Sequence, residues 1–137
     1  SYLKKVEVFL VEENYLKSLP TSMSDLKALQ VVDLSSNKLS IVQDELCSLC
    51  NLRILKLHSN ELTKISDQIG NLKSLELIDI SNNNLSFLPE SFCFLENLVS
   101  ANLSNNELLD LPSKFEFLQQ LEYLDLSFNN LHVSRFF

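Results

Sequence analysis

The residues best suited to metal or redox chemistry in this chain are three cysteines and two histidines. Cys47 and Cys50 have the spacing typical of a pair of zinc ligands, and Cys93 stands alone. A structural zinc site needs four ligands. No second pair accompanies this one, because His58 and His132 fall in other parts of the pattern described below. We therefore interpret the cysteines as structural residues, and we expect neither a metal nor a cofactor.

A second arrangement with catalytic potential is a row of serines that shares its place in the pattern with His58. The serines are Ser35, Ser81, Ser104 and Ser127. Nucleophilic catalysis would need one of them beside the histidine, together with donors for an oxyanion. We expect this row to lie on an open, wet surface without such donors. The one glycine, Gly70, also excludes a glycine-rich phosphate loop. The sequence predicts that the chain is not an enzyme.

A spacing of 23 residues runs through the whole chain and is marked most strictly by asparagine. The six are Asn14, Asn37, Asn60, Asn83, Asn106 and Asn129. A period kept through six copies indicates a solenoid. A buried asparagine donates two hydrogen bonds and accepts two, so it can satisfy backbone groups where the chain turns away from a strand. We interpret the six asparagines as a structural ladder.

Each repeat predicts one strand and one short helical turn. Counting the asparagine as position 9, positions 1, 4, 6 and 11 are apolar almost throughout, and alternation around positions 3 to 7 predicts a strand. Apolar residues at positions 14, 18 and 21 predict a short helical turn with one inward face. The predicted fold class is therefore α/β: a solenoid with a curved parallel sheet on its concave face and short helical or 3-10 turns on its convex face.

The frame LPxxFxxLxxLxxLxLSxNxL, clearest from Leu88 to Leu108, resembles the intracellular 23-residue class of leucine-rich repeats. It is similar to the repeats of Ras-scaffold proteins and of Scribble- and Erbin-type scaffolds. The resemblance covers residues 6–133. It implies one leucine-rich-repeat domain over residues 1–137 with six repeats, and it implies protein binding on the concave face.

The two terminal repeats depart from that frame. The first is degenerate, with Val6, Phe9 and Val11 where leucine is usual, and the last is incomplete, with Ser134 at position 14. Since Ser1 is not a start methionine, we expect the sequence to belong to a longer chain. A solenoid must cover its end repeats or expose its core. We therefore expect either further chain at both ends or self-association through the uncapped ends.

Side chains at positions 3, 5 and 7 are expected to point to the concave front, where an aliphatic row lies beside a row of alternating charge. The predicted partner-binding residues are Val31, Asp33, Ile54, Lys56, His58, Leu77, Asp79, Asn102, Tyr123, Asp125 and Phe128. Exposed ion pairs contribute only about 0–1 kcal/mol, so the charges fit partner recognition better than stability. His58 would make binding sensitive to pH near neutrality. The alternative is that the aliphatic row only packs against its stacked neighbours.

The amino-acid composition restricts the class of partner and the cellular compartment that we expect for this chain. Eleven Lys and Arg against 18 Asp and Glu give a net charge of −7, which argues against nucleic acid or an anionic membrane surface as partner. No apolar run is long enough for a transmembrane helix. An odd cysteine count without cysteine-rich ends favours a reducing compartment, and we predict a cytoplasmic protein. Two glycosylation sequons, at Asn84 and Asn102, matter only for a secreted chain.

Three functions stay open at this point. We favour a non-enzymatic protein-interaction module with a scaffold or regulatory role in signalling. The second is the recognition domain of a larger enzyme, such as a kinase, a phosphatase or a ubiquitin ligase, whose catalytic part lies outside this chain. The third is a secreted or receptor-type ectodomain. The fold supports all three, because one scaffold serves many partners.

Overall fold

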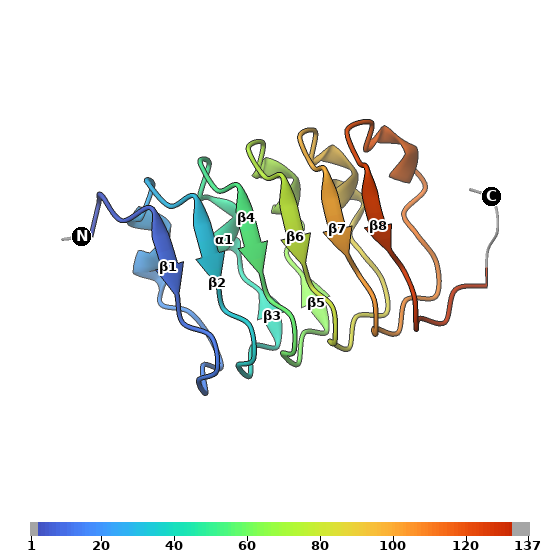
Figure 1. Cartoon of the computed structure of the whole chain (residues 1–137), viewed down its shortest axis with the longest axis horizontal. Helices are drawn as coiled ribbons and strands as arrows, with labels where there is room; N and C mark the ends of the chain where they lie inside the picture. The colour runs from blue at the N-terminus through green and yellow to red at the C-terminus, as the bar shows by residue number, and fades with distance from the viewer. Residues whose placement is uncertain (1–2, 133–137) are drawn as a thin grey trace.

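The computed structural model describes residues 3–132, which coil into a solenoid of stacked turns (Figure 1). Each turn contributes one three-residue strand to a six-stranded parallel sheet. In sheet order the strands are β1 (Val8–Leu10), β2 (Val31–Asp33), β4 (Ile54–Lys56), β6 (Leu77–Asp79), β7 (Ser100–Asn102) and β8 (Tyr123–Asp125). Partners across each strand pair are 23 residues apart, so residues at the same position of successive repeats stand side by side. The predicted parallel sheet is confirmed.

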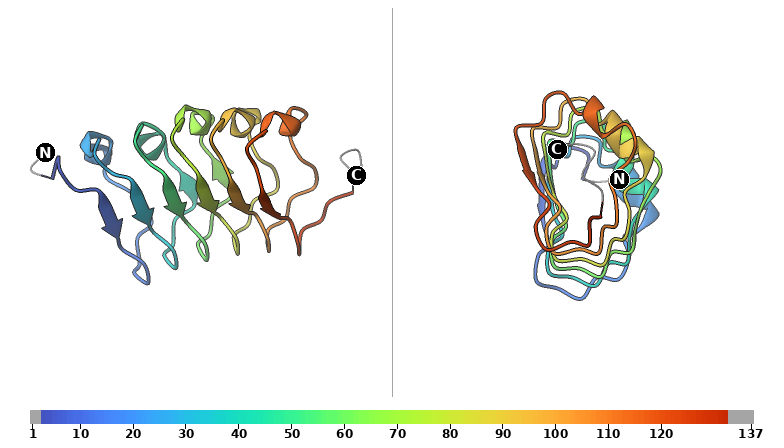
Figure 2. Two further views of the ribbon diagram at one scale, coloured as in Figure 1. Left: turned by 45° about the horizontal axis from the view of Figure 1, so that its top comes forward. Right: turned by 90° about the vertical axis from the view of Figure 1, so that its right-hand side faces the viewer.

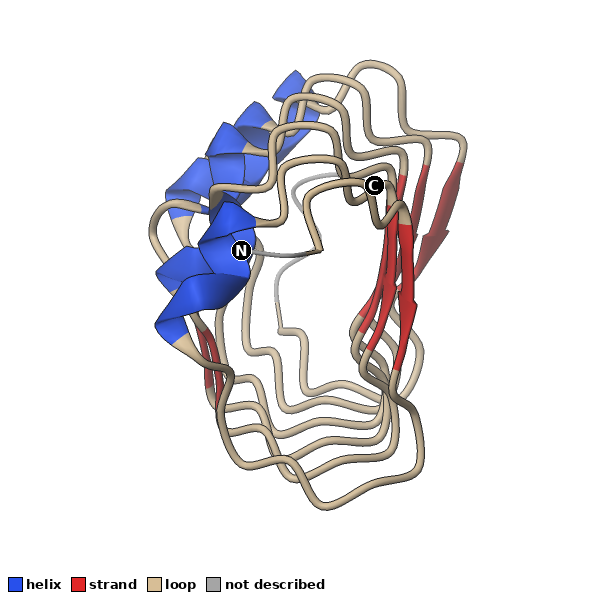
Figure 3. Ribbon diagram, turned by 90° about the vertical axis from the view of Figure 1, so that its left-hand side faces the viewer, coloured by secondary structure: helices blue, strands red, loops and turns tan. Residues whose placement is uncertain are grey.

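The helical turns lie on the side of the solenoid opposite the sheet, so the sheet has one open face (Figure 3). They are η1 (Thr21–Asp25), α1 (Asp44–Cys47), η2 (Ile69–Asn71), η3 (Glu90–Phe94) and η4 (Phe115–Phe117); four are 3-10 helices and α1 is a single α-helical turn. The two views in Figure 2 show that the path of the chain repeats almost unchanged from turn to turn. We call the sheet side the front and the helical side the back.

The core fills the space between front and back with rows of aliphatic side chains. One row, at position 1, is formed by Leu29, Leu52, Leu75 and Leu98, all with no exposed surface. Burying a leucine side chain contributes roughly 1.5–3 kcal/mol, so these rows supply most of the stability. The rows open at both ends: Val6 and Phe9 are only partly buried in the first repeat, as are Leu126 and Leu131 in the last. β1 and β8 are the edges of the sheet. Association through these ends stays a prediction, and Ser134 lies outside the described residues.

A second, two-stranded parallel sheet joins β3 (Ile41–Val42) to β5 (Lys64–Ile65) on the flank below the helical turns. The repeat pattern gave no indication of this sheet. Its inter-repeat bond runs from the backbone N of Ser66 to the carbonyl of Val42, at 2.9 Å. The corresponding residue is proline in three other repeats (Pro20, Pro89 and Pro112). Proline has no N–H to donate, so the fourth and fifth repeats cannot extend the second sheet, which joins the second and third repeats.

Position 8 of every repeat adopts a left-handed backbone, which also went unpredicted. The residues are Glu13, Ser36, Ser59, Asn82, Asn105 and Phe128, with φ between 54° and 58°. This conformation turns the chain away from the strand and presents the asparagine that follows. Asparagine tolerates it well, whereas a bulky residue such as Phe128 is strained there.

Candidate functional site

The open front face carries two parallel rows of side chains from the six strands. Position 3 supplies the first row, in which Val31, Ile54 and Leu77 are half-buried neighbours on β2, β4 and β6. The row is interrupted on β7, where the small Ser100 stands between Leu77 and Tyr123. Tyr123, on β8, has 53% of its surface exposed. The aliphatic strip therefore covers β2, β4 and β6 and gives way to a polar gap on β7 and an aromatic ring on β8.

Position 5 supplies the second row, whose acidic and amide side chains are held by the turn that follows each strand. The backbone N of Ser81 donates to Oδ1 of Asp79 at 3.0 Å, and its hydroxyl donates to the same oxygen at 2.7 Å. Asn102 receives the same two bonds from the next serine in the row, at 3.1 and 2.7 Å. Because one oxygen is fixed in this way, the rest of each head group is held at the front.

Asp125 repeats this arrangement on β8. The hydroxyl of Ser127, and then its backbone N–H, hold the pKa of the Asp125 carboxyl below its usual value. Hydrogen bonds to the ionised form favour that form. Asp125 is therefore a charged acceptor throughout the neutral range.

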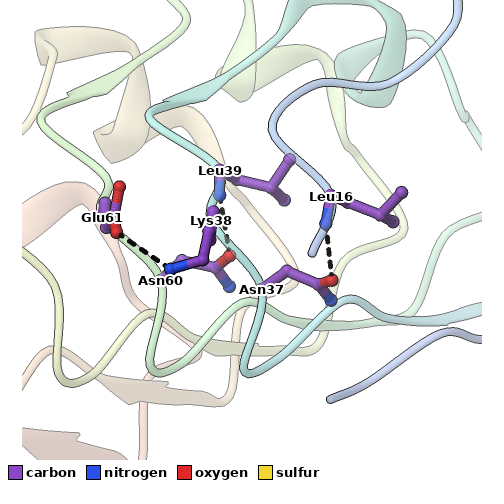
Figure 4. Close-up of polar contacts among 6 residues, drawn as sticks. All are labelled: Leu16, Asn37, Lys38, Leu39, Asn60 and Glu61. Carbon is purple, nitrogen blue, oxygen red and sulfur yellow. Dashed lines mark hydrogen bonds and ion pairs between the residues drawn. The ribbon is translucent and has the colours of Figure 1, made fainter. Parts of the chain in front are cut away.

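Lys56 is exposed in the middle of the charged row and has no hydrogen bond or ion pair within residues 3–132. Its Cα partners in the neighbouring strands are Asp33 and Asp79. The cross-repeat ion pairs that do form lie outside this row: Lys38 with Glu61 at 3.9 Å (Figure 4), and Arg53 with Glu76 at 2.9 Å. An ammonium left unpaired between two acidic neighbours is available to a partner.

The prediction that the serine row lies on an open surface is wrong for three of its four members, and it holds for Ser127, which is exposed. Ser35, Ser81 and Ser104 have at most 6% of their surface exposed. The strands end at position 5, so the alternation of side chains stops there, and the chain bends position 7 inward. His58 is half-buried, and its Nδ1 lies 3.1 Å from the hydroxyl of Ser59, which is not in the row. Ser35, Ser81 and Ser104 are therefore not accessible nucleophiles.

Phe128 is the last of the predicted partner-binding residues along the chain. It has 77% of its surface exposed and a left-handed φ of 56°. It follows the end of β8 by three residues. A strained, exposed aromatic residue is a candidate contact site.

The asparagines link each repeat to the one before it. Asn83 is typical: its Nδ2 donates to the carbonyls of Leu57, Ile80 and Ser81 at 3.0–3.1 Å, and its Oδ1 accepts from the backbone N of Leu62 at 2.9 Å. Figure 4 shows the equivalent bonds from Leu16 to Asn37 and from Leu39 to Asn60. Asn14 lies in the first described repeat and donates to carbonyls of its own turn. The side chains of the other five asparagines bond to backbone groups through both Nδ2 and Oδ1.

The three cysteines are free thiols in different surroundings. Cys47 and Cys93 are buried in the back, whereas Cys50 is exposed. Burial raises the pKa of the Cys47 thiol to about 12 and that of Cys93 to about 11. Among the described residues no group of histidine, cysteine and carboxylate side chains is placed to hold a metal ion. No helix within residues 3–132 is long and apolar enough to span a membrane.

Several solved structures share this architecture. Internalin C2 from Listeria monocytogenes matches with a TM-score of 0.85 at 23% identity, over 96% of this chain and 56% of that one. The leucine-rich-repeat ectodomain of the receptor kinase GASSHO1/SCHENGEN3 from Arabidopsis thaliana matches with a TM-score of 0.83 at 31% identity, over 94% and 16%. The plant peptide hormone receptor RGFR1 matches with a TM-score of 0.81 at 31% identity, over 92% and 21%.

This chain therefore spans about half the length of the internalin, about a sixth of the GASSHO1/SCHENGEN3 chain and about a fifth of the RGFR1 chain. No curated protein matches the sequence. The family model described as "leucine-rich repeat region" matches residues 5–135, nearly the full length. With the 23-residue register of the sheet and the asparagine bonds between turns, this match shows that the chain belongs to the leucine-rich repeat region family.

Proposed function

We propose that this chain is a protein-interaction module that binds a partner protein on its front face, centred on Ile54, Lys56, His58, Leu77 and Asp79. The observation that carries the proposal is the open sheet itself. Parallel sheets are normally covered on both faces, and here one face is free of helices (Figure 3). That face offers a half-exposed aliphatic row beside an unpaired ammonium, which is a combination of apolar contact and charge that a protein surface can match.

Two of the similar structures support a peptide or protein as partner. The GASSHO1/SCHENGEN3 ectodomain is in complex with CASPARIAN STRIP INTEGRITY FACTOR 2, and RGFR1 is in complex with RGF2. Both share 31% identity with this chain over more than nine-tenths of its length. An extended front that spans six strands at about 4.8 Å each provides a binding surface roughly 25 Å across.

The role we assign to the module is a scaffold or regulatory one in the cytoplasm, as in the intracellular 23-residue class that the sequence resembles. The free state of all three thiols supports a reducing compartment. A recognition domain of a larger enzyme would use the same face, with catalysis elsewhere in the chain. A receptor-type ectodomain is favoured instead by the two plant receptors.

The test compares front-face variants with matched variants on the flank. The front variants are Lys56→Glu, at an exposed residue, and Leu77→Ser, at a half-exposed one. The flank variants, Lys64→Glu and Ile41→Ser, make the corresponding changes at exposed residues of the second sheet. Proteins captured by the immobilised chain are quantified by mass spectrometry for all five forms, and thermal unfolding is measured in parallel.

We expect at least one captured protein to be lost with both front variants and kept with both flank variants. Loss of a contact at the centre of an interface weakens binding by more than tenfold where that contact is a hot spot, whereas the melting temperatures should differ by only a few degrees. If every captured protein binds all five forms equally, the partner does not use the front and the proposal is wrong.

A further inference from the structure

The net negative charge of this protein is concentrated on one side of the solenoid. We define the front arcs as positions 2 to 10 of each repeat, which comprise the strand, the residue before it and the asparagine turn. The arcs are residues 7–15, 30–38, 53–61, 76–84, 99–107 and 122–130. They contain ten Asp and Glu against three Lys and Arg, whereas the rest of the sequence holds eight of each. The whole net charge of −7 therefore lies in the front arcs.

Within the front arcs the charge is also uneven along the solenoid. All three cations, Lys38, Arg53 and Lys56, belong to the second and third repeats. The last three arcs carry five carboxylates and no Lys or Arg. These are Glu76, Asp79, Glu107, Glu122 and Asp125. Of the five, Glu76 alone has an ion pair within residues 3–132, with Arg53 of the preceding repeat. The front of β6, β7 and β8 therefore faces solvent with uncompensated negative charge.

The side chains on this part of the front are suited to a basic group. Asp79 and Asp125 each use one carboxylate oxygen to accept bonds from the following serine, and the other oxygen accepts no hydrogen bond within residues 3–132. Asn102 lies between Asp79 and Asp125 in one row, and Ser100 lies between Leu77 and Tyr123 in the other. Both side chains are short, so the front surface is polar and shallow on β7. Leu77 and Tyr123 are two strands apart, about 10 Å. The exposed ring of Tyr123 offers a face for a cation.

We propose that the partner places an arginine- or lysine-bearing protein segment across β6, β7 and β8. A basic side chain is received between Asp79 and Asp125 against Tyr123, and aliphatic side chains lie on the strip formed by Val31, Ile54 and Leu77. This inference rests on the proposed function and adds the chemistry of the partner. Complementary charge at an exposed rim acts mainly on the association rate and on the choice of partner.

The chain itself provides a structure-preserving way to remove the charge. Asn102 makes the same two bonds in this row that Asp79 and Asp125 make. Asp79→Asn and Asp125→Asn therefore keep the acceptor and the turn while removing the negative charge. The control is Asp67→Asn with Glu96→Gln, two exposed residues outside the front arcs, which changes the net charge by the same amount. Asn102→Asp adds a carboxylate to the row and tests the opposite direction.

The probes are two fluorescein-labelled peptides of twelve residues that alternate leucine and serine, with three arginines in one and three glutamines in the other. Binding is measured by fluorescence anisotropy in 50 and 200 mM salt. We expect the arginine peptide to bind more tightly. Asp79→Asn with Asp125→Asn should weaken that binding by roughly two- to fivefold per carboxylate. The control pair should leave it within about twofold, and Asn102→Asp should tighten it. Higher salt should reduce the differences.

The outcomes separate this inference from the function on which it rests. If both peptides bind equally and Leu77→Ser weakens both, the front is the binding face but its partner is not basic, and the inference is wrong. If the control pair weakens the arginine peptide as much as the front pair, only net charge attracts it, and the inference is again wrong. Binding that ignores Leu77→Ser as well as the front pair contradicts both proposals, as does a failure of the arginine peptide to bind at millimolar concentration.

Discussion

Replacing Asn83 by alanine should destabilise the protein far more than the same change at Asn14. Asn83 is buried and makes four hydrogen bonds to backbone groups of its own and the preceding turn. The carbonyl of Ser81 keeps a second donor, the backbone N of Ser59 at 3.0 Å. The carbonyls of Leu57 and Ile80 also keep a donor, Nδ2 of Asn60 at 3.0 Å and Nδ2 of Asn106 at 2.9 Å. Asn83→Ala therefore leaves one backbone group, the N–H of Leu62, unsatisfied in the core, and it removes one of two bonds from each of three carbonyls.

An unsatisfied buried backbone group costs about 1–3 kcal/mol. The three lost carbonyl bonds add about 0.5–1.5 kcal/mol each, so the total is roughly 2.5–7.5 kcal/mol, and water entering the vacated space brings the loss to the lower part of that range, about 4 kcal/mol. A domain of this length has a free energy of unfolding of about 7–20 kcal/mol. At about 4 °C per kcal/mol the melting temperature should fall by roughly 15 °C. Asn14 donates two bonds within an exposed turn, so Asn14→Ala should cost about 1 kcal/mol or less.

Urea unfolding followed by circular dichroism measures both variants against the parent chain. A third variant, Asn83→Asp, separates hydrogen bonding from volume. A carboxylate keeps the acceptor for Leu62 but places negative charge against the carbonyls of Leu57 and Ile80, so it should be at least as destabilising as alanine at pH 7 and less so in mild acid. Equal losses for Asn83→Ala and Asn14→Ala would refute the ladder as the source of this stability.

Three further predictions concern the helical turns, the left-handed position and the thiols. Gly70→Ala should lower the free energy of unfolding by about 1–3 kcal/mol, because the added Cβ would lie 2.5 Å from the carbonyl oxygen of Ser91; an unchanged urea midpoint would contradict this. Phe128→Asn should raise stability by roughly 1 kcal/mol through relief of the left-handed strain, and should weaken partner binding if the ring is a contact. Ellman's reagent at pH 8 should titrate one thiol in the native chain, that of Cys50, and all three in urea, since burial raises the pKa of Cys47 to about 12. Because the folded-state pKa lies above the ordinary 9.0, the free energy of unfolding should fall as the pH rises from about 9 towards 12, and Cys47→Ala should reduce that fall.

The sequence by itself determined the architecture, because a solenoid has only nearest-neighbour contacts. The 23-residue period places each residue beside its counterparts in the adjoining turns. A residue such as Leu75 therefore shows its environment directly: it lies between Leu52 and Leu98, and all three are buried. The strands, their parallel order and the inward rows of the helical turns follow from position in the repeat alone. So does the set of residues on β2, β4 and β6 that stand together on the front.

What the period did not determine was the direction of side chains where the chain leaves regular structure. Alternation predicted an exposed row at position 7, but the strand ends at position 5 and Ser81 turns inward to bond Asp79. The left-handed residue at position 8 has no fixed residue type, since Glu13 and Phe128 both occupy it, so composition carries no signal for it. The second sheet depended on which repeats lack proline, a detail that matters only once two turns are stacked.

The charge distribution on the surface depends on both the sequence and the tertiary structure. The sequence specifies the sign and position of each charge along the chain, and from these alone only the net charge of −7 follows. The concentration of negative charge on the front becomes visible once each residue is assigned to the front or the back of the fold. Hydrogen bonds across turns then decide which of those charges are neutralised and which are held in place: Arg53 pairs with Glu76, whereas Lys56 stays unpaired. Local pattern specifies a backbone that repeats, because the interactions that build it are the same in every turn. Side-chain partners differ from turn to turn, so only the folded stack decides them.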